Sequence, residues 1–551
     1  MQIVTRQVDD LHFLTRRVVC GVQWHGAILQ LAVETEGKYH MKSRETETRA
    51  LLILLGVSAL LLLLGLGTRE LWGPETRWAN ITLQMLQSGN YFDPYLMGGS
   101  YYDKPLPSYW LITATTWFTG GLGHWSLRLT SVISAWLSVW LVYLIGEQLF
   151  RKGTGLIAGW MLATTFYFVF WARVATADIL TVCGVLAAIW WYWRGPDDTR
   201  LGRYCVFFLL LSVTSLFKGL IGFILPGLVL LPHLLQDGRW KRHLNLRLCV
   251  ALLVGGLVYA VPFVLSNIYG APTSAENGLG LVFRENVVRF FQPFDHIGPI
   301  YTYLIYLPVY TLPWAPYWVL GLWVAARNWR TLEPNARWLI WGLGFLFLFF
   351  TASGSRRSYY VLPLVPFAQL LAAWWVTRRM EERRAAGKTE GRGLKIGFGV
   401  TTALLLLILG IIVPWSNTGG GVMQFGKDVK AQASLIAPWN QWRMVMVEVD
   451  NKVPMYLQNG GAPFYYVPDT QDFPREGTTA QFMAWLDKTS GQHWDPQRTI
   501  IVAHYKRGDQ LPLNYLTADH QAVVTQPDNG ERLLHPRSDA SVAFIPNAPA
   551  Q

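Results

Sequence analysis

The amino-acid sequence predicts an α-helical membrane protein with about eleven to thirteen transmembrane helices and a small α/β domain at its carboxyl end. Of the 551 residues, 52% are hydrophobic and only 15% are charged, whereas soluble domains carry about 25% charged residues. Apolar runs of about 20 residues, the length that crosses a bilayer core, recur along the chain. After Pro414 they give way to shorter, strand-like segments.

Residues 1–49 are predicted to form a cytoplasmic amino-terminal segment. Residues 1–40 contain neither the apolar core nor the cleavage site of a secretory signal peptide. Met41 opens a basic stretch directly before the first apolar run. We therefore expect translation to start at Met41; residues 1–40 are then not part of the protein, and the alternative is that they form a disordered tail.

The membrane domain is predicted over residues 50–414 and contains eleven apolar runs. The additional run Pro105–Gly120 is shorter and rich in Pro, Thr and Trp, so we expect it to lie at the membrane interface or to re-enter. A merged or missed pair would give thirteen spans. The predicted spans are residues 51–67, 126–149, 154–172, 176–193, 204–217, 219–236, 248–266, 301–325, 337–352, 358–377 and 396–414.

The net charge of +12 is explained by the orientation of these spans. With eleven spans, the basic loops, including residues 194–203, 239–247 and 378–395, all fall on one face. Lys and Arg collect in cytoplasmic loops, so this face is predicted to be cytoplasmic. The charge therefore gives no reason to expect a nucleic-acid partner.

The opposite face receives a first outer loop, residues 68–125, that is much longer than a connection between two helices requires. Loops of this length are usually functional. This one carries Glu75, Arg77, Asp103 and Lys104 among several tyrosines. We predict that it forms one wall of an active site.

Two charged residues border later spans on the same outer face. Asp178, with Thr176, is suited to begin a helix as a first-turn acid, which does not exclude a role in the site. Lys218 stands between two apolar runs with no acid nearby in the sequence. It is either a lysine that extends to the membrane interface or a phosphate-binding cation.

Further cations lie in two other outer segments. Arg284 and Arg289 belong to the loop 267–300, where an amphipathic surface helix with solvated charges is the alternative explanation. Arg356 and Arg357 lie in an outer turn against the usual distribution of positive charge, and an anionic ligand would compensate for this.

Carboxylates next to cations suit group transfer on a phosphorylated, membrane-borne substrate. The cations stabilise a phosphate leaving group, and a carboxylate, Glu75 or Asp178, takes or positions the proton of an attacking hydroxyl. ATP is not expected because the sequence has no Walker A pattern. The outer acids also offer oxygen ligands to Mg²⁺ or Mn²⁺, but no DxD motif occurs here, and metal dependence stays open.

Residues 415–551 are predicted to form a small α/β domain outside the membrane. Strand-like patterns cover residues 442–450, 462–469 and 499–505, and a helix is expected over residues 478–491.

The outer-face motifs resemble the GT-C glycosyltransferases of the protein O-mannosyltransferase and lipid A aminoarabinose transferase type. The matching pieces follow the order found in that family. They are residues 74–110, 125–135, 172–178, 218–226, 284–290, 312–318 and 353–373.

This resemblance implies a polyprenyl-phosphate-linked sugar donor, such as an undecaprenyl-phosphate sugar, and a periplasmic acceptor such as lipid A or another envelope glycan or lipid. It implies a bacterial inner-membrane location with the site on the periplasmic face. Lys104 would bind the donor phosphate, Asp178 would be a second site carboxylate, and Arg356 and Arg357 would face the phosphate. The remaining candidates for binding the substrate are Arg77, Tyr101, Asp103, Lys218, Arg284 and Tyr360.

The chain departs from the family pattern at the start of the outer loop. An Asp-Glu pair is typical there, but Pro74 precedes Glu75 in this sequence, and Asn80 replaces a later acid. This leaves three alternatives. Glu75 takes over the activation of the acceptor, or the acceptor differs from that of the family. In the third, the protein has lost activity and serves as a scaffold of an envelope complex. A lipid or sugar transporter without covalent chemistry is the alternative function, although paired halves with broken helices, typical of transporters, are not evident.

Overall fold

A computed structural model describes most of the chain in two units, residues 1–57 and 58–551. The described residues are 45–102, 104–270, 284, 288–292, 297–388, 391–467, 472–534 and 539–548. In the first unit, residues 45–57 are helical and begin the helix Glu45–Leu63. The expected untranslated segment 1–40 lies outside the described residues. The sites described below lie in the second unit.

Helices occur in every one of the eleven predicted spans. Within the described residues, seven helices are individually long and apolar enough to cross a membrane. They are Glu45–Leu63, α4 (His124–Leu149), α8 (Leu201–Lys218), α11 (Leu246–Tyr269), α16 (Pro334–Ala352), the continuous segment Ser358–Ala385 that contains α17 (Val365–Ala385), and Arg392–Ser416, which begins with α18 (Arg392–Leu407).

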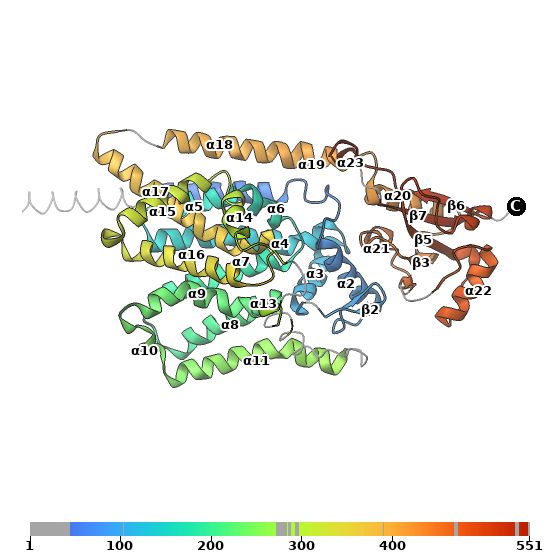
Figure 1. Cartoon of the computed structure of the whole chain (residues 1–551), viewed down its shortest axis with the longest axis horizontal. Helices are drawn as coiled ribbons and strands as arrows, with labels where there is room; N and C mark the ends of the chain where they lie inside the picture. Colours follow the sequence, from blue (N-terminus) through green and yellow to red (C-terminus); the bar gives the residue numbers. More distant parts are fainter. Residues whose placement is uncertain are drawn as a thin grey trace, which may run out of the picture. The chain divides into compact units, whose positions relative to one another are not determined.

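The other four predicted spans consist of shorter helices. Two are single helices, α7 (Ala177–Trp193) and α9 (Ile221–Leu235), and two are pairs. The pairs are α5 (Thr154–Ala163) with α6 (Phe166–Ala172), and α14 (Thr302–Tyr310) with α15 (Ala315–Arg327). α8 packs against α7, α9 and α11. Figure 1 shows α8 between α9 and α11.

The predicted continuous span 154–172 is wrong in detail, because α5 and α6 meet at an angle of 66°. Thr164 and Thr165 lie at the bend, and their hydroxyls donate hydrogen bonds of 2.6 Å to the Trp160 and Met161 carbonyls of the preceding turn. Such side-chain bonds compete with the helical ladder and bend helices. The second pair is likewise interrupted at residues 311–314, where the sequence predicts one span over 301–325.

The first outer loop contains two helices, α2 (Glu75–Ser88) and α3 (Pro107–Thr119). α3 lies within the run expected at the interface, and at 13 residues it is too short to cross a bilayer. Trp117 and Phe118 at its carboxyl end are 80% and 85% exposed. Aromatic side chains in this position are typical of the membrane–water interface.

The carboxyl-terminal residues form a five-stranded sheet in the order β4-β3-β5-β7-β6. β3 pairs in parallel with β4 and β5, and β7 pairs antiparallel with β5 and β6. The strands are β3 (Arg443–Val447), β4 (Tyr465–Tyr466), β5 (Thr499–Lys506), β6 (His520–Val524) and β7 (Asp539–Pro546). The three predicted strands and the predicted helix, α22 (Thr479–Ser490), are confirmed, while β6 and β7 were not predicted.

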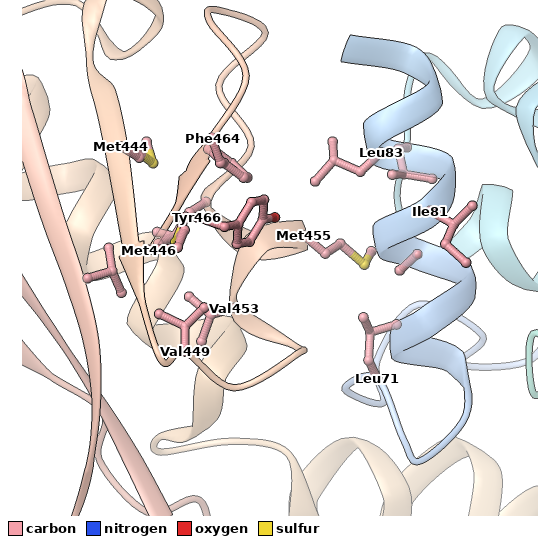
Figure 2. Packing of buried hydrophobic residues seen from close by; sticks show 14 of the residues in the cluster. Leu71, Ile81, Leu83, Met444, Met446, Val449, Val453, Met455, Phe464 and Tyr466 are labelled. Carbon is pink, nitrogen blue, oxygen red and sulfur yellow. The ribbon is translucent and has the colours of Figure 1, made fainter. Parts of the chain in front are cut away.

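One face of this sheet shares a hydrophobic core with α2. Figure 2 shows Leu71 and Leu83 pointing toward Met455 and Tyr466 of the carboxyl-terminal region. Met455 belongs to the short helix α21 (Val453–Leu457). The outer loop is therefore clamped between the helical bundle and the sheet.

A half-buried carboxylate adds a polar connection to this contact. Glu70 Oε1 accepts a hydrogen bond of 2.7 Å from the backbone N–H of Met423, in the first turn of α20 (Gly421–Ser434). Glu70 thereby supplies the cap that Gly420, the residue before α20, cannot. Burial raises the pKa of Glu70, and the Met423 N–H opposes this change.

We expect Gly421→Ala to loosen this contact. Gly421 has φ +84°, and an added Cβ would lie 2.3 Å from Glu70 Oε1, so the carboxylate would have to leave its N–H partner. Gly508→Ala is the matched control, since Gly508 has φ +99° but open space around the Cβ position. Both changes cost about 1–2 kcal/mol for the left-handed backbone, and Gly421→Ala loses roughly 1 kcal/mol more for the cap. Hydrogen exchange of α20 in the full-length protein should rise only in Gly421→Ala; equal protection in both variants would contradict the capping role.

Candidate active site

An ion pair joins the ends of two neighbouring helices. Lys218, the last residue of α8, donates a hydrogen bond of 2.5 Å to Asp178 in the first turn of α7. The Thr176 hydroxyl accepts from the Asp178 N–H at 3.5 Å, so the expected helix start at Thr176 is confirmed. Asp178 is only 7% exposed. The acid that Lys218 lacks among its sequence neighbours comes from 40 residues earlier in the chain.

Lys218 also faces an aromatic ring. Its ammonium group lies 4.8 Å from the centre of the Tyr360 ring. Tyr360 belongs to the 3₁₀ segment Ser358–Leu364, which precedes α17. A carboxylate on one side and a ring face on the other restrict the lysine to a narrow range of positions.

A cavity of about 370 Å³ opens beside this pair. Lys104, Lys218 and Tyr360 line it, as does Arg289 from α13 (Arg289–Phe291). The rest of the wall is mainly apolar. It includes Ile221, Ile224, Phe290, Phe291, Phe349 and Phe350. The cavity thus combines three cationic side chains with a hydrocarbon-like surface.

The structure brings only some of the predicted site residues to this cavity. Arg77 donates a hydrogen bond of 2.6 Å to the Tyr101 hydroxyl and lies over that ring, outside the cavity lining. Asp103 lies outside the described residues. Arg284 is half-buried and is not among the lining residues. Arg289 from the same loop, which was not predicted as a site residue, lines the cavity instead.

The two arginines of the outer turn bind protein groups. Arg356 donates to the carbonyl of Gly298 at 2.6 Å and, through two nitrogens, to that of Thr351 at 2.9 and 3.1 Å. Arg357 donates to the Tyr359 hydroxyl at 2.7 Å. Ser355 of the same turn lines the cavity. In this arrangement Arg356 fixes the turn that forms part of the cavity wall.

Glu75 is fully buried, with an exposed fraction of 0%. Its closest partner is Arg128 of α4, which donates to both carboxylate oxygens at 2.7 and 2.9 Å. Arg69 adds a bond of 3.1 Å. The backbone N–H groups of Trp72 and Ala175 complete the set at 2.9 and 3.0 Å. Every side of the carboxylate is occupied by a protein donor.

This geometry does not favour Glu75 as the group that contacts substrate. Burial alone would raise its pKa, but Arg128, Arg69 and the Ala175 N–H outweigh burial and lower the pKa. The carboxylate is therefore held as an anion without access to an acceptor. Glu75 accepts a hydrogen bond from Ala175, which precedes Asp178 by three residues. Arg77 follows Glu75 by two residues. Glu75 is better described as a positioning residue.

Three arginines around Glu75 were not among the predicted site residues. Arg128 also donates to the carbonyls of Leu66 and Glu70, at 2.6 and 3.0 Å. Arg173 donates to the carbonyls of Leu61 and Leu62. The sequence did offer one signal for this cluster. Arg128 is a charged residue close to the start of a predicted span, and such residues are costly to bury and need a partner.

The described residues contain no group of three or more His, Cys, Asp or Glu side chains that could hold a metal ion. The positive charge of the cavity comes instead from Lys104, Lys218 and Arg289. Cations beside an apolar wall, at one end of a helical bundle, suit a ligand that carries both a phosphate and a lipid chain.

Comparisons with known proteins identify the class of enzyme. Residues 103–265 match the family model for dolichyl-phosphate-mannose-protein mannosyltransferases. An undecaprenyl phosphate-α-4-amino-4-deoxy-L-arabinose arabinosyl transferase from Yersinia enterocolitica is 24% identical over 522 residues, which cover 88% of this chain and 91% of the relative. A second such transferase from Pseudomonas fluorescens is 30% identical over 379 residues, covering 65% and 66%.

The fold agrees with these relatives. The crystal structure of ArnT from Cupriavidus metallidurans bound to undecaprenyl phosphate superposes with a TM-score of 0.66 at 18% identity, covering 91% of this chain and 99% of that one. The chain belongs to the GT-C glycosyltransferase superfamily that contains the ArnT-like aminoarabinose transferases. It is a multi-pass membrane glycosyltransferase that uses a lipid-phosphate-linked sugar donor.

We expect Glu75→Gln to destabilise the protein by about 3–5 kcal/mol, because it leaves Arg128 buried without its counter-charge. Glu448→Gln is the matched control. It breaks the exposed Glu448–Arg475 pair, with side chains 45% and 72% exposed, and should cost less than about 1 kcal/mol. Because the Glu75 pKa is lowered on folding, its stabilisation is present at neutral pH and is lost as the pH falls through the folded-state pKa.

The measurement is the thermal unfolding midpoint of the purified full-length protein at neutral pH. A Glu75→Gln protein as stable as the control, yet inactive, would contradict the positioning role and restore Glu75 as a catalytic acid or base.

Proposed function

We propose that this glycosyltransferase transfers an aminopentose from an undecaprenyl-phosphate donor to a lipid acceptor of the bacterial envelope, at the periplasmic face of the inner membrane. The observation that carries the proposal is the cavity that joins Lys104, Lys218 and Arg289 to an apolar wall. The sugar and its carrier are those for which the related transferases are named.

In this proposal the cations hold the donor phosphate and the apolar wall receives the first part of the prenyl chain. Lys218 is already oriented by Asp178 and by the Tyr360 ring. An ammonium group that is fixed before the substrate binds needs no reorganisation when charge develops on the leaving group. Asp178 acts here through Lys218 and is a second positioning residue.

The reaction forms one bond and breaks one. An oxygen of the acceptor attacks the anomeric carbon of the sugar, and the bond from that carbon to the phosphate oxygen breaks. The electron pair remains on the leaving undecaprenyl phosphate, whose added negative charge is stabilised by Lys104, Lys218 and Arg289. A hydroxyl acceptor would also have to lose a proton, whereas a phosphate acceptor would not.

The surroundings of residue 75 support an acceptor that is already an anion. Pro74 has no side-chain acid, and Glu75 is enclosed by its donors. A phosphate group of an envelope lipid, such as those of lipid A, can attack without a general base. This acceptor is compatible with the chain's departure from the family pattern.

We expect Lys104→Ala to lower product formation by about 10²–10³-fold, the range typical for removal of one preorganised donor to a developing negative charge. Purified protein is incubated with the undecaprenyl-phosphate aminopentose and lipid A, and the products are measured by mass spectrometry. Lys430→Ala, an exposed lysine of α20, should retain full activity. Undiminished product from Lys104→Ala would exclude this donor site, and donor movement across proteoliposomes without any covalent product would favour a transporter.

We also expect turnover to persist after treatment with EDTA. Lys104, Lys218 and Arg289 together would neutralise the negative charge of the donor phosphate, so no divalent ion is needed for this purpose. The same product assay is run with EDTA-treated protein, with and without added Mg²⁺ or Mn²⁺. Loss of activity that one of these ions restores would show that the side chains are insufficient.

A further inference from the structure

A second cavity, of about 270 Å³, lies at the opposite ends of α7 and α8 from the Asp178–Lys218 pair. Trp191 and Tyr192 from the end of α7 and Tyr204 from the start of α8 form part of its wall. α7 has 17 residues, so the two sites are separated by about 25 Å of helix. The transfer reaction proposed above does not involve this second cavity.

The wall of the second cavity is mostly aromatic and aliphatic. The Tyr192 hydroxyl is bonded to His233 and the Tyr204 hydroxyl to His243, both at 2.8 Å. Both tyrosine hydroxyls are thus satisfied within the protein. Gly227 of α9 also lines the cavity, and a Cβ at this position would meet nothing within 4 Å. Glycine inside a helix costs about 1 kcal/mol relative to alanine, and here it leaves the cavity open.

The connections that flank the cavity are strongly basic. Residues 194–203 and 236–247 together contain seven Lys or Arg residues and three Asp residues. Asp198 pairs with Arg200 at 2.6 Å, and Asp197 is shared by Arg239 and Arg242. An excess of four positive charges remains.

Exposed apolar residues are interspersed with these cations. Leu235, Leu244 and Leu246 are 57%, 65% and 78% exposed, on either side of the short basic helix α10 (Trp240–His243). Exposed leucines alternating with Lys and Arg are typical of a segment that lies in the membrane interface. The mouth of the cavity is therefore at the depth of the lipid head groups.

We propose that this cavity binds an anionic phospholipid, with part of an acyl chain among the aromatic side chains and the head group on Arg239 and Arg242, which adjoin the lining residues Trp240 and His243. Basic pockets between transmembrane helices attract anionic head groups. The general preference for positive charge on the cytoplasmic side would by itself explain the cations in these loops. It does not explain why they lie beside a cavity with open space at Gly227. The bound lipid would connect α7, α8 and α9, which also carry the donor site.

The test measures lipid retention by the full-length protein. Protein is reconstituted with phosphatidylglycerol or with phosphatidylcholine of the same acyl chains, and retained lipid is counted by native mass spectrometry. We expect retention of phosphatidylglycerol to exceed that of phosphatidylcholine by roughly tenfold, the effect of one to two cations near the head group. Gly227→Phe fills the cavity and should abolish the preference. Gly256→Phe, on α11 with equally open space, should keep it.

A second pair of variants tests the charges without altering the cavity. Arg239→Gln combined with Arg242→Gln should reduce phosphatidylglycerol retention. Arg327→Gln combined with Arg330→Gln should not, although these residues belong to the basic loop 327–337, whose charge likewise predicts a cytoplasmic position. Equal retention of the two lipids by the wild-type protein would overturn the proposal. Unchanged retention in either Gly227→Phe or the Arg239–Arg242 variant would also overturn it.

Discussion

The arrangement of the outer face depends on one buried ion pair, between Glu75 and Arg128. A buried charge is tolerated only when it is paired and all its hydrogen-bonding groups are satisfied, and both side chains meet this condition. The partners come from α4, from the start of the outer loop and from the turn before α7. The pair therefore fixes the first residues of α2 relative to the bundle, and with them Arg77 and the helix start that carries Asp178.

The same constraint explains how the carboxyl-terminal sheet becomes part of the site's architecture. Once Glu75 fixes the amino end of α2, Leu83 of that helix and Leu71 of the preceding loop face the sheet. Glu70, five residues earlier, caps α20 from the same loop. Thus the loop is joined to the membrane bundle by the Glu75–Arg128 pair and to the carboxyl-terminal region by apolar packing and the Glu70 cap.

The sequence predicted the helices and the three parallel strands of the sheet, β4, β3 and β5, well, because hydropathy and residue alternation report directly on burial. It did not predict the bend at Thr164 and Thr165, because hydropathy does not show whether a hydroxyl group donates a hydrogen bond to the preceding turn of the helix. Asp178 and Lys218 were both predicted as site residues, but their contact was not, because it joins helix ends 40 residues apart. Glu75 was predicted to be catalytic because an acid in an outer loop looks the same whether it is exposed or enclosed by Arg128.

The replacement of the family's aspartate by Pro74 now has a physical context. Pro74 precedes α2 with φ −66°, a value that suits proline, and the helix begins normally after it. The substitution therefore removes a carboxylate without disturbing the fold or the Glu75–Arg128 pair. An acceptor phosphate, as proposed above, does not need that carboxylate as a base. The cations of the cavity would stabilise the leaving group for a hydroxyl or a phosphate acceptor alike.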